Sequence, residues 1–219
     1  DHITERSNFL PPDNYQEDRK EKVVYRTSPT NIGLGLLAVV ASYDLGFEKL
    51  EDTINLLYKM LDSVSRMQKW NGHLYNWYDL KTLNPLTPKY VSTVDSGNFV
   101  GYLYTLKQFL VDAHDTIISD GLKGKFELNK DRSKKEDIIS ERIVEKDLEK
   151  TDKNVNDIEQ INNNNSNNID NTDDTNNTNN EQHIIEKINL MLEIIDKLIN
   201  NTNFKYLYSE ENRIFSIGF

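Results

Sequence analysis

The residues best suited to chemistry lie in one stretch, residues 70–98, between two segments with helical periodicity of apolar residues. The stretch holds both tryptophans of the chain together with tyrosines, carboxamides and carboxylates: Trp70, Tyr75, Asn76, Trp77, Tyr78, Asp79, Tyr90, Asp95 and Asn98. Loops of this length inside a compact domain are usually either functional or disordered. Because disordered segments are poor in aromatic residues, the composition favours a functional loop.

The side chains of this loop are the types that carbohydrate sites combine. An aromatic ring covers the apolar C–H face of a sugar, while carboxylates and carboxamides bind paired hydroxyls. The run from Asn76 to Asp79 supplies all three types, and we predict a ligand role for Trp77 and Asp79. Asp95 and Asn98 add a carboxylate and a carboxamide at the start of a predicted helix, where free N–H groups suit oxygen-rich ligands.

Structural roles compete with each of these assignments. The rings at 70, 77 and 78 could anchor the loop on the core, and Asp95 or Ser96 could simply cap the following helix. His73 could be an acid/base group, but a single loop histidine is more often packed. Arg26 could bind a ligand or pair with an acidic residue. A complete small hydrolase using Asp79 and Asp95 also stays open, because their separation cannot be read from sequence.

Composition excludes several function classes. The chain has 219 residues and a net charge of -10, which argues against a nucleic-acid partner because phosphate binding needs a basic surface. With no cysteine and four scattered histidines, we expect neither a disulfide framework nor a metal site, and no motif indicates a cofactor. No window approaches 18 consecutive apolar residues, so we predict no membrane span in this chain.

Helices must position the loop. Ser28 followed by Pro29 predicts a helix start, with Thr30 as the competing cap, and the apolar run 32–43 continues that helix. Gly33 and Gly35 on one side of it indicate close approach of a backbone or a ligand. A second helix is predicted over 47–69, with an apolar stripe of Leu50, Ile54, Leu57, Leu61 and Val64, and a third from Asp95 or Ser96 to about 118. A fourth is predicted over 184–200, with an apolar stripe of Ile185, Ile188, Leu192, Ile195 and Ile199. Two short extended runs, 204–208 and 213–219, predict a C-terminal hairpin.

Residues 119–183 differ from the rest in composition. A run of charged residues is followed by an asparagine-rich tract with no aromatic residue after Phe126. Such a segment cannot bury enough apolar surface to offset its ordering entropy, so we predict a disordered insertion. The expected domain is therefore residues 1–118 continued by 184–219. Both ends look cut from a longer protein.

Five blocks of the sequence carry a resemblance to a known family. They are Leu10–Asp18, Arg26–Gly33, Gly72–Asp79, Tyr90–Asn98 and Phe215–Phe219, and in this order they resemble the glycoamylase-like segment of cyclic β-1,2-glucan synthases. The resemblance covers about residues 7–118 and 184–219. It implies an all-α fold, part of an (α/α)6 toroid whose helices surround a central cleft.

The resemblance also implies an activity and partners. The corresponding domain acts on β-1,2-linked glucose polymers, in the synthases by a retaining transglycosylation that closes the linear glucan into a ring. The synthases are large membrane-associated proteins, so we expect this chain to work beside the remaining modules of a larger synthase at the cytoplasmic face of a membrane. A non-catalytic glucan-binding or scaffold module is the alternative.

The resemblance transfers binding residues but no catalytic ones. In the family the catalytic glutamates follow the Phe-Ser-Ile-Gly block, where this chain stops, so we expect the fragment alone to be inactive. The positions expected to contact sugar or to support the cleft are Arg26, Asn31, Asn76, Trp77, Tyr78, Asp79, Asp95 and Asn98.

Overall fold

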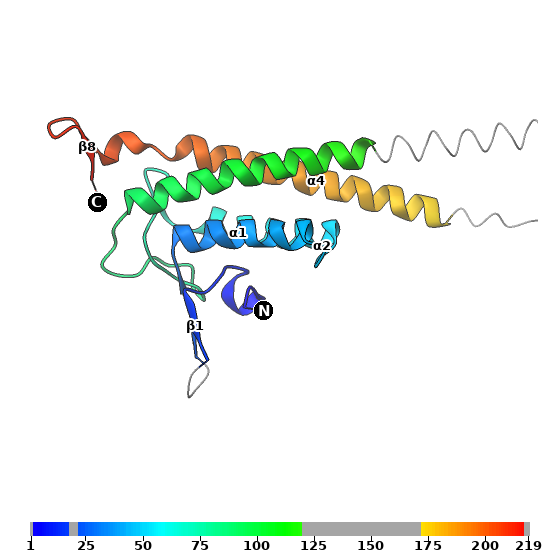
Figure 1. Cartoon of the computed structure of the whole chain (residues 1–219), viewed down its shortest axis with the longest axis horizontal. Coiled ribbons are helices and arrows are strands. Elements are labelled where there is room, and N and C mark those ends of the chain that lie inside the picture. The colour runs from blue at the N-terminus through cyan, green and yellow to red at the C-terminus, as the bar shows by residue number, and fades with distance from the viewer. Residues whose placement is uncertain (1, 18–21, 120–171, 217–219) are drawn as a thin grey trace, which may run out of the picture. The chain divides into compact units, whose positions relative to one another are not determined.

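The computed structural model describes residues 2–17, 22–119 and 172–216 (Figure 1). The chain divides into two compact units, residues Asp1–His114 with Gln182–Phe219, and residues Asp115–Glu181. Two helices cross the boundary of the first unit: the helix of residues 93–119 ends beyond His114, and helix α4 begins before Gln182.

Helix α1 (Pro29–Asp44) begins where the sequence predicts. The Ser28 side chain accepts the backbone N–H of Asn31, and Pro29 occupies the first turn, where its missing N–H costs nothing. A Cβ at Gly35 would clash with the ring of Pro11 and a Cβ at Gly33 with the ring of Tyr102, so a larger residue at either position would displace its neighbour. Close approach at both glycines is confirmed, but by side chains rather than by a backbone or ligand.

Three further helices complete the helical core. Helix α2 (Leu50–Arg66) packs against α1. It buries Ile54, Leu57, Leu61 and Val64 of the predicted stripe, whereas Leu50 at its start is half-buried. The helix of residues 93–119 buries Phe99, Leu103, Leu106 and Leu110. Helix α4 (Thr172–Asn201) buries Ile188, Met191, Ile195 and Leu198. Burial of such apolar side chains is the main stabilising term of the fold.

Polar contacts join α4 to its neighbours within the first unit. Lys107 of the 93–119 helix pairs with Asp196, and Lys187 donates to the side-chain oxygen of Asn55 in α2 at 2.6 Å. Figure 1 shows α4 running alongside the 93–119 helix. The segments before and after the predicted insertion therefore share one core.

Short antiparallel strand pairs organise the loops. Strand β1 (Asn14–Gln16) pairs with β2 (Lys22–Val24), and β4 (Lys69–Trp70) pairs with β5 (His73–Leu74). Strand β3 (Arg26–Thr27) pairs with β6 (Tyr78–Asp79), which brings Arg26 opposite Asp79. Strand β7 (Tyr208–Ser209) pairs with β8 (Ile214–Phe215) to form the C-terminal hairpin. Single 3-10 turns occur at Glu5–Ser7 (η1) and Phe204–Leu207 (η2).

The predicted fold class is confirmed: the chain is mainly helical with a short C-terminal hairpin. The described helices are consistent with part of a toroid, and within the described residues they do not close a ring. Helix α4 begins at Thr172, earlier than predicted, so the last part of the asparagine-rich tract is helical. The rest of the predicted insertion, residues 120–171, lies outside the described residues. No helix in the described part is long and apolar enough to cross a membrane.

Candidate functional site

Trp77 lies at the centre of a cluster of polar and aromatic side chains drawn from four segments. The pairing of β3 with β6 sets Trp77 beside Arg26. The first turns of α1 and of the 93–119 helix supply Thr30, Asn31 and Asp95, and non-helical segments supply Asp13, Asn76 and Tyr90. We call this cluster the Trp77 network. It comprises Asp13, Arg26, Thr30, Asn31, Asn76, Trp77, Tyr90 and Asp95.

One side of the network holds the face of the indole. The Arg26 guanidinium carbon lies 4.2 Å from the centroid of the Trp77 ring, a cation–π arrangement. Two nitrogens of Arg26 donate to the same Asp13 oxygen, Nε at 3.0 Å and Nη2 at 2.9 Å. The other Asp13 oxygen accepts from Nδ2 of Asn31 at 3.2 Å. Asp13 therefore connects the guanidinium over the indole to the first turn of α1.

The other side of the network holds the indole N–H. In the amide orientation that satisfies every polar atom, Oδ1 of Asn76 accepts from Nε1 of Trp77 at 2.7 Å and from the Tyr90 hydroxyl at 2.6 Å. In the same orientation Nδ2 of Asn76 donates to Oδ2 of Asp95 at 3.0 Å. Asn76 is buried, and its own backbone N–H donates to the carbonyl of Tyr90 at 2.8 Å. These bonds hold the indole N–H against the carboxamide of Asn76.

Asp95 closes the network into a ring. The Thr30 hydroxyl donates to Oδ1 of Asp95 at 2.6 Å, and Thr30 precedes Asn31 directly in α1. The path therefore returns from Asp95 through Thr30, Asn31 and Asp13 to Arg26. A closed ring of contacts leaves each member with few alternative rotamers and holds the indole in one position.

The edge of the network is open to solvent. Asn98 is exposed, and its Nδ2 lies 3.4 Å from the Thr30 hydroxyl. Tyr90 is exposed at 37%, and both Trp77 and Asp95 are half-buried. A half-buried indole and carboxylate thus lie beside an exposed carboxamide and phenol, a set that suits a neutral ligand rich in hydroxyls.

The structure separates Tyr78 and Asp79 from this region. Tyr78 is completely buried; its hydroxyl donates to the Gln68 carbonyl at 2.6 Å and accepts the N–H of Tyr75 at 2.8 Å. Burial raises the pKa of the Tyr78 phenol. We therefore place Tyr78 in the core, which corrects the expectation of a sugar-facing ring.

The Asp79 side chain stabilises the turn that follows it. Its Oδ1 accepts the backbone N–H groups of Lys81 at 2.9 Å and Thr82 at 2.8 Å, and the Thr82 hydroxyl at 3.0 Å. A carboxylate with three local donors at one oxygen is the mark of an Asx-type turn. The geometry gives no support to a hydrolase built on Asp79 and Asp95.

Asp95 does not cap its helix, and that prediction is wrong. The Ser92 side chain caps the 93–119 helix by accepting the backbone N–H of Asp95 at 3.2 Å. Asp95 lies in the first helical turn instead, which frees its carboxylate for Thr30 and Asn76. A serine three residues before an acidic residue is a common capping pattern, and this spacing was the signal to follow.

His73 is packed rather than catalytic. It is 1% exposed, its ring lies edge-on to Phe204, and neither ring nitrogen has a hydrogen-bond partner among the described side chains. Burial lowers the pKa of His73, and the backbone of Asn203 opposes that shift only in part.

Three members of the network were not among the predicted site residues: Asp13, Thr30 and Tyr90, the last of which was named only as one of the aromatic residues of the loop. Asp13 lies in an irregular leader, and Thr30 was considered only as a cap. The proline pair before Asp13 was the available signal, because Pro11 packs on Gly35 and thereby fixes the leader against α1. Among the described residues no group of three His, Cys, Asp or Glu is placed to hold a metal ion.

Comparison with known proteins supports the resemblance seen in the sequence. Over 101 residues, 46% of this chain, the sequence is 48% identical to the cyclic β-(1,2)-glucan synthase NdvB of Rhizobium meliloti strain 1021. The resemblance to the cyclic β-1,2-glucan synthases is confirmed. The match spans 4% of that relative's length, and no family model matches the chain.

A solved structure also resembles part of the chain. It is a candidate glucoamylase from Bacteroides fragilis NCTC 9343, with a TM-score of 0.43 and 16% sequence identity. The similarity covers 47% of this chain and 26% of that one.

Proposed function

We propose that this chain forms one wall of a glucan-binding cleft in a domain that processes β-1,2-linked glucose polymers. The observation that carries the proposal is the closed ring of contacts that holds Trp77 while the edge at Asn98 and Tyr90 stays accessible. The identity to a cyclic β-(1,2)-glucan synthase supplies the substrate class.

The chemistry of the network suits a neutral sugar. Stacking on an indole needs a rigid, correctly oriented ring, since rotamer ordering on binding would otherwise weaken the affinity. Arg26 and Asn76 hold the indole of Trp77 in one orientation before any ligand binds. Asn98 and the free lone pairs of Asp95 are placed to bind hydroxyl groups at the edge of a stacked ring.

We further propose that the reaction is a retaining transglycosylation, with the catalytic acids supplied by other parts of a larger, membrane-associated synthase on the cytoplasmic face. The resemblance is the support for this step. The alternative, a non-catalytic glucan-binding or scaffold module, uses the same surface. The two differ in one respect: in the larger protein, Trp77→Ala lowers the rate of ring closure in the first case and leaves the rate unchanged in the second.

Calorimetric titration of the 219-residue chain with linear β-1,2-glucan tests the binding step. Trp77→Ala should weaken binding about tenfold, the loss of roughly 1.4 kcal/mol expected for a central aromatic contact. Tyr104→Ala is the matched control, because Tyr104 is an aromatic residue exposed at 59% outside the network. Equal affinities of the wild type and Trp77→Ala would contradict the proposal.

A further inference from the structure

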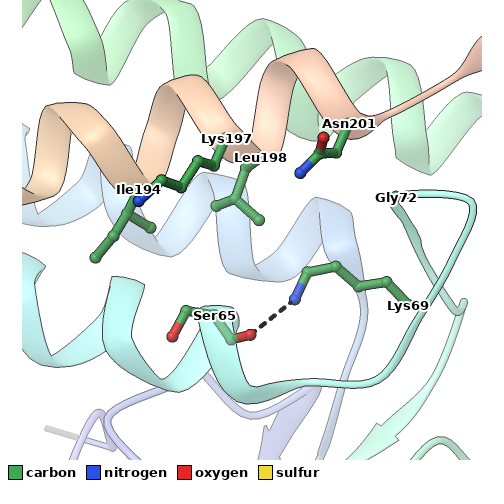
Figure 2. Close-up of a pocket in the computed structure, with 7 residues that line it drawn as sticks. All are labelled: Ser65, Lys69, Gly72, Ile194, Lys197, Leu198 and Asn201. Atoms are coloured by element: carbon green, nitrogen blue, oxygen red, sulfur yellow. Dashed lines mark hydrogen bonds between the residues drawn. The ribbon is translucent and has the colours of Figure 1, made fainter.

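A pocket that shares no residue with the Trp77 network lies between the C-terminal ends of α2 and α4. Its volume is about 260 Å³. Figure 2 shows Ile194, Lys197 and Leu198 of α4 on one side, and Ser65 and Lys69 on the other. Ile194 and Leu198 give the pocket an apolar wall.

The side chains that line this pocket include two ammonium groups and no carboxylate. The residues that line it are Ser65, Lys69, Gly72, Ile194, Lys197, Leu198 and Asn201. Such a set attracts an anion rather than a cation. Because most of the remaining lining is aliphatic, a ligand also needs an apolar part.

Lys69 is a half-buried cation without an acidic partner among the described residues. Its Nζ donates to the backbone carbonyls of Val64 at 2.7 Å, Met67 at 2.9 Å and Ser65 at 3.2 Å. These carbonyls satisfy its N–H groups but supply no full negative charge. Accordingly, burial lowers the pKa of Lys69 to about 8.

The hydrogen-bond distances of the Lys69 ammonium indicate which of its N–H groups would bind an anion. The bond to Ser65 is the longest of the three, and Ser65 is the partner that lines the pocket (Figure 2). A carboxylate could replace this carbonyl and form a stronger, charge-assisted bond.

Lys197 provides the second positive charge at the rim. It is paired with Glu193 at 3.7 Å, and both side chains are more than 60% exposed, at 73% and 66%. Exposed pairs of this kind contribute little and exchange readily. Lys197 can therefore leave Glu193 and contact a ligand with little loss of free energy.

We propose that this pocket binds a small carboxylate with an apolar body, held by Lys69 and Lys197 and seated on Ile194 and Leu198. At roughly 30 Å³ per water-sized group, the volume holds about nine such groups, the size of hexanoate or benzoate. The site is independent of the proposed glucan surface, and its failure would leave that proposal untouched.

Titration of the whole 219-residue chain with hexanoate, followed by NMR chemical shifts, tests the proposal. We expect saturable, roughly millimolar binding, with shifts at Ile194 and Leu198. Hexanamide and hexylammonium, which match its length but lack the negative charge, should bind at least tenfold more weakly.

Substitutions distinguish direct binding by Lys69 and Lys197 from a general effect of removing positive charge. Lys197→Gln, at an exposed position that does not threaten folding, should weaken hexanoate about two- to fivefold. Lys69→Met should weaken it at least tenfold, and Lys205→Gln, an exposed lysine outside the pocket, should leave it unchanged. The proposal is overturned if hexanoate does not bind, if hexanamide binds as tightly, or if Lys197→Gln and Lys69→Met both leave the affinity unaltered.

Discussion

Trp77 is constrained at two different points, and these constraints act on different degrees of freedom. The Arg26 guanidinium restricts motion of the ring along its normal, whereas the bond to Asn76 restricts rotation within the ring plane. With either contact alone, the indole could still make the motion that the other contact restricts. The combination explains how a half-buried aromatic side chain can stay ordered at an accessible edge.

Removing the guanidinium should loosen the indole while leaving the fold intact. Arg26→Ala is expected to cost about 0.5–1 kcal/mol of unfolding free energy, the usual value of a partly exposed cation–π contact. In a Trp70→Phe background, acrylamide quenching of Trp77 fluorescence should increase. Arg66→Ala is the matched control, because Arg66 lies on α2 outside the Trp77 network, where it pairs with Asp62 and donates to the Ser63 hydroxyl at 3.0 Å. Unchanged quenching in Arg26→Ala would show that Arg26 does not hold the ring.

Stability should fall as the solution becomes acidic because His73 is buried and neutral. The pKa of His73 is lowered in the folded state, so the unfolded chain binds the proton first as pH falls below about 6.5. The stabilisation is complete above that pH and is lost progressively toward the folded-state pKa. Urea unfolding at several pH values should show this slope, and His73→Phe should reduce it.

The control for this titration is another histidine. His183, exposed on α4, can be replaced by Gln with the same loss of a titratable group. The acid-dependent loss of stability should persist in His183→Gln. If His73→Phe retained the full slope, a different group would be responsible.

At the scale of elements, Gly72 fixes the end of α4 against the turn between β4 and β5. Its φ of +85° requires a left-handed backbone, and a Cβ there would collide with the carbonyl oxygen of Asn201. Gly72→Ala should cost about 2–4 kcal/mol, combining the conformational penalty with displacement of a backbone. Gly46→Ala isolates the first term, since Gly46 has φ +77° but open space around it; it should cost only about 1 kcal/mol. Equal losses in thermal unfolding would contradict the packing role.

Substitution by alanine should change the free energy of unfolding in opposite directions at two helical glycines, Gly33 and Gly101. A Cβ at Gly33 meets the ring of Tyr102, so Gly33→Ala should destabilise the contact between α1 and the 93–119 helix by about 1–3 kcal/mol. Gly101 has no neighbour within 4 Å, so Gly101→Ala should stabilise the protein by about 0.5–1 kcal/mol through helix propensity. Denaturant midpoints of the two variants test this, and a shift in the same direction for both would be inconsistent with the packing.

Periodicity predicted the helices well because their buried stripes repeat every three or four residues. In α2 the predicted Ile54, Leu57, Leu61 and Val64 are all fully buried. In α4 the predicted stripe included Leu192 and Ile199, but Met191 and Leu198 are the buried residues. One-residue errors of this kind arise because adjacent apolar residues fit either side of a helical stripe, and only the neighbouring helix decides.

The site was predicted less completely than the helices. Arg26, Asn76, Trp77, Asp95 and Asn98 do come together, whereas Tyr78 and Asp79 turn to the core and to a local turn. Strand alternation explains part of this, since neighbours on β6 point to opposite sides. Asp13 was missed because its partners lie 13 and 18 residues away along the chain, and the proline pair before it indicates a fixed leader but not these contacts.

At the scale of the whole molecule, distant segments meet at the start of the 93–119 helix. The Thr93 hydroxyl donates to the carbonyl of Ser216 beside the C-terminal hairpin, while Asp95 contacts α1 and Asn76. The described parts of all five sequence blocks that carry the resemblance belong to the first compact unit. This arrangement gives the resemblance a structural reason: the shared residues build one region rather than scattered positions.

The central claim is that the indole at 77 receives a sugar ring of a β-1,2-glucan. The most direct test is a titration of the Trp70→Phe variant with linear β-1,2-glucan, with Trp77 as the single fluorescent reporter. We predict a saturable change in emission together with reduced acrylamide quenching, as expected when a sugar covers the indole. Saturable glucan binding that left both the emission and the quenching of Trp77 unchanged would contradict it, and so would the absence of binding.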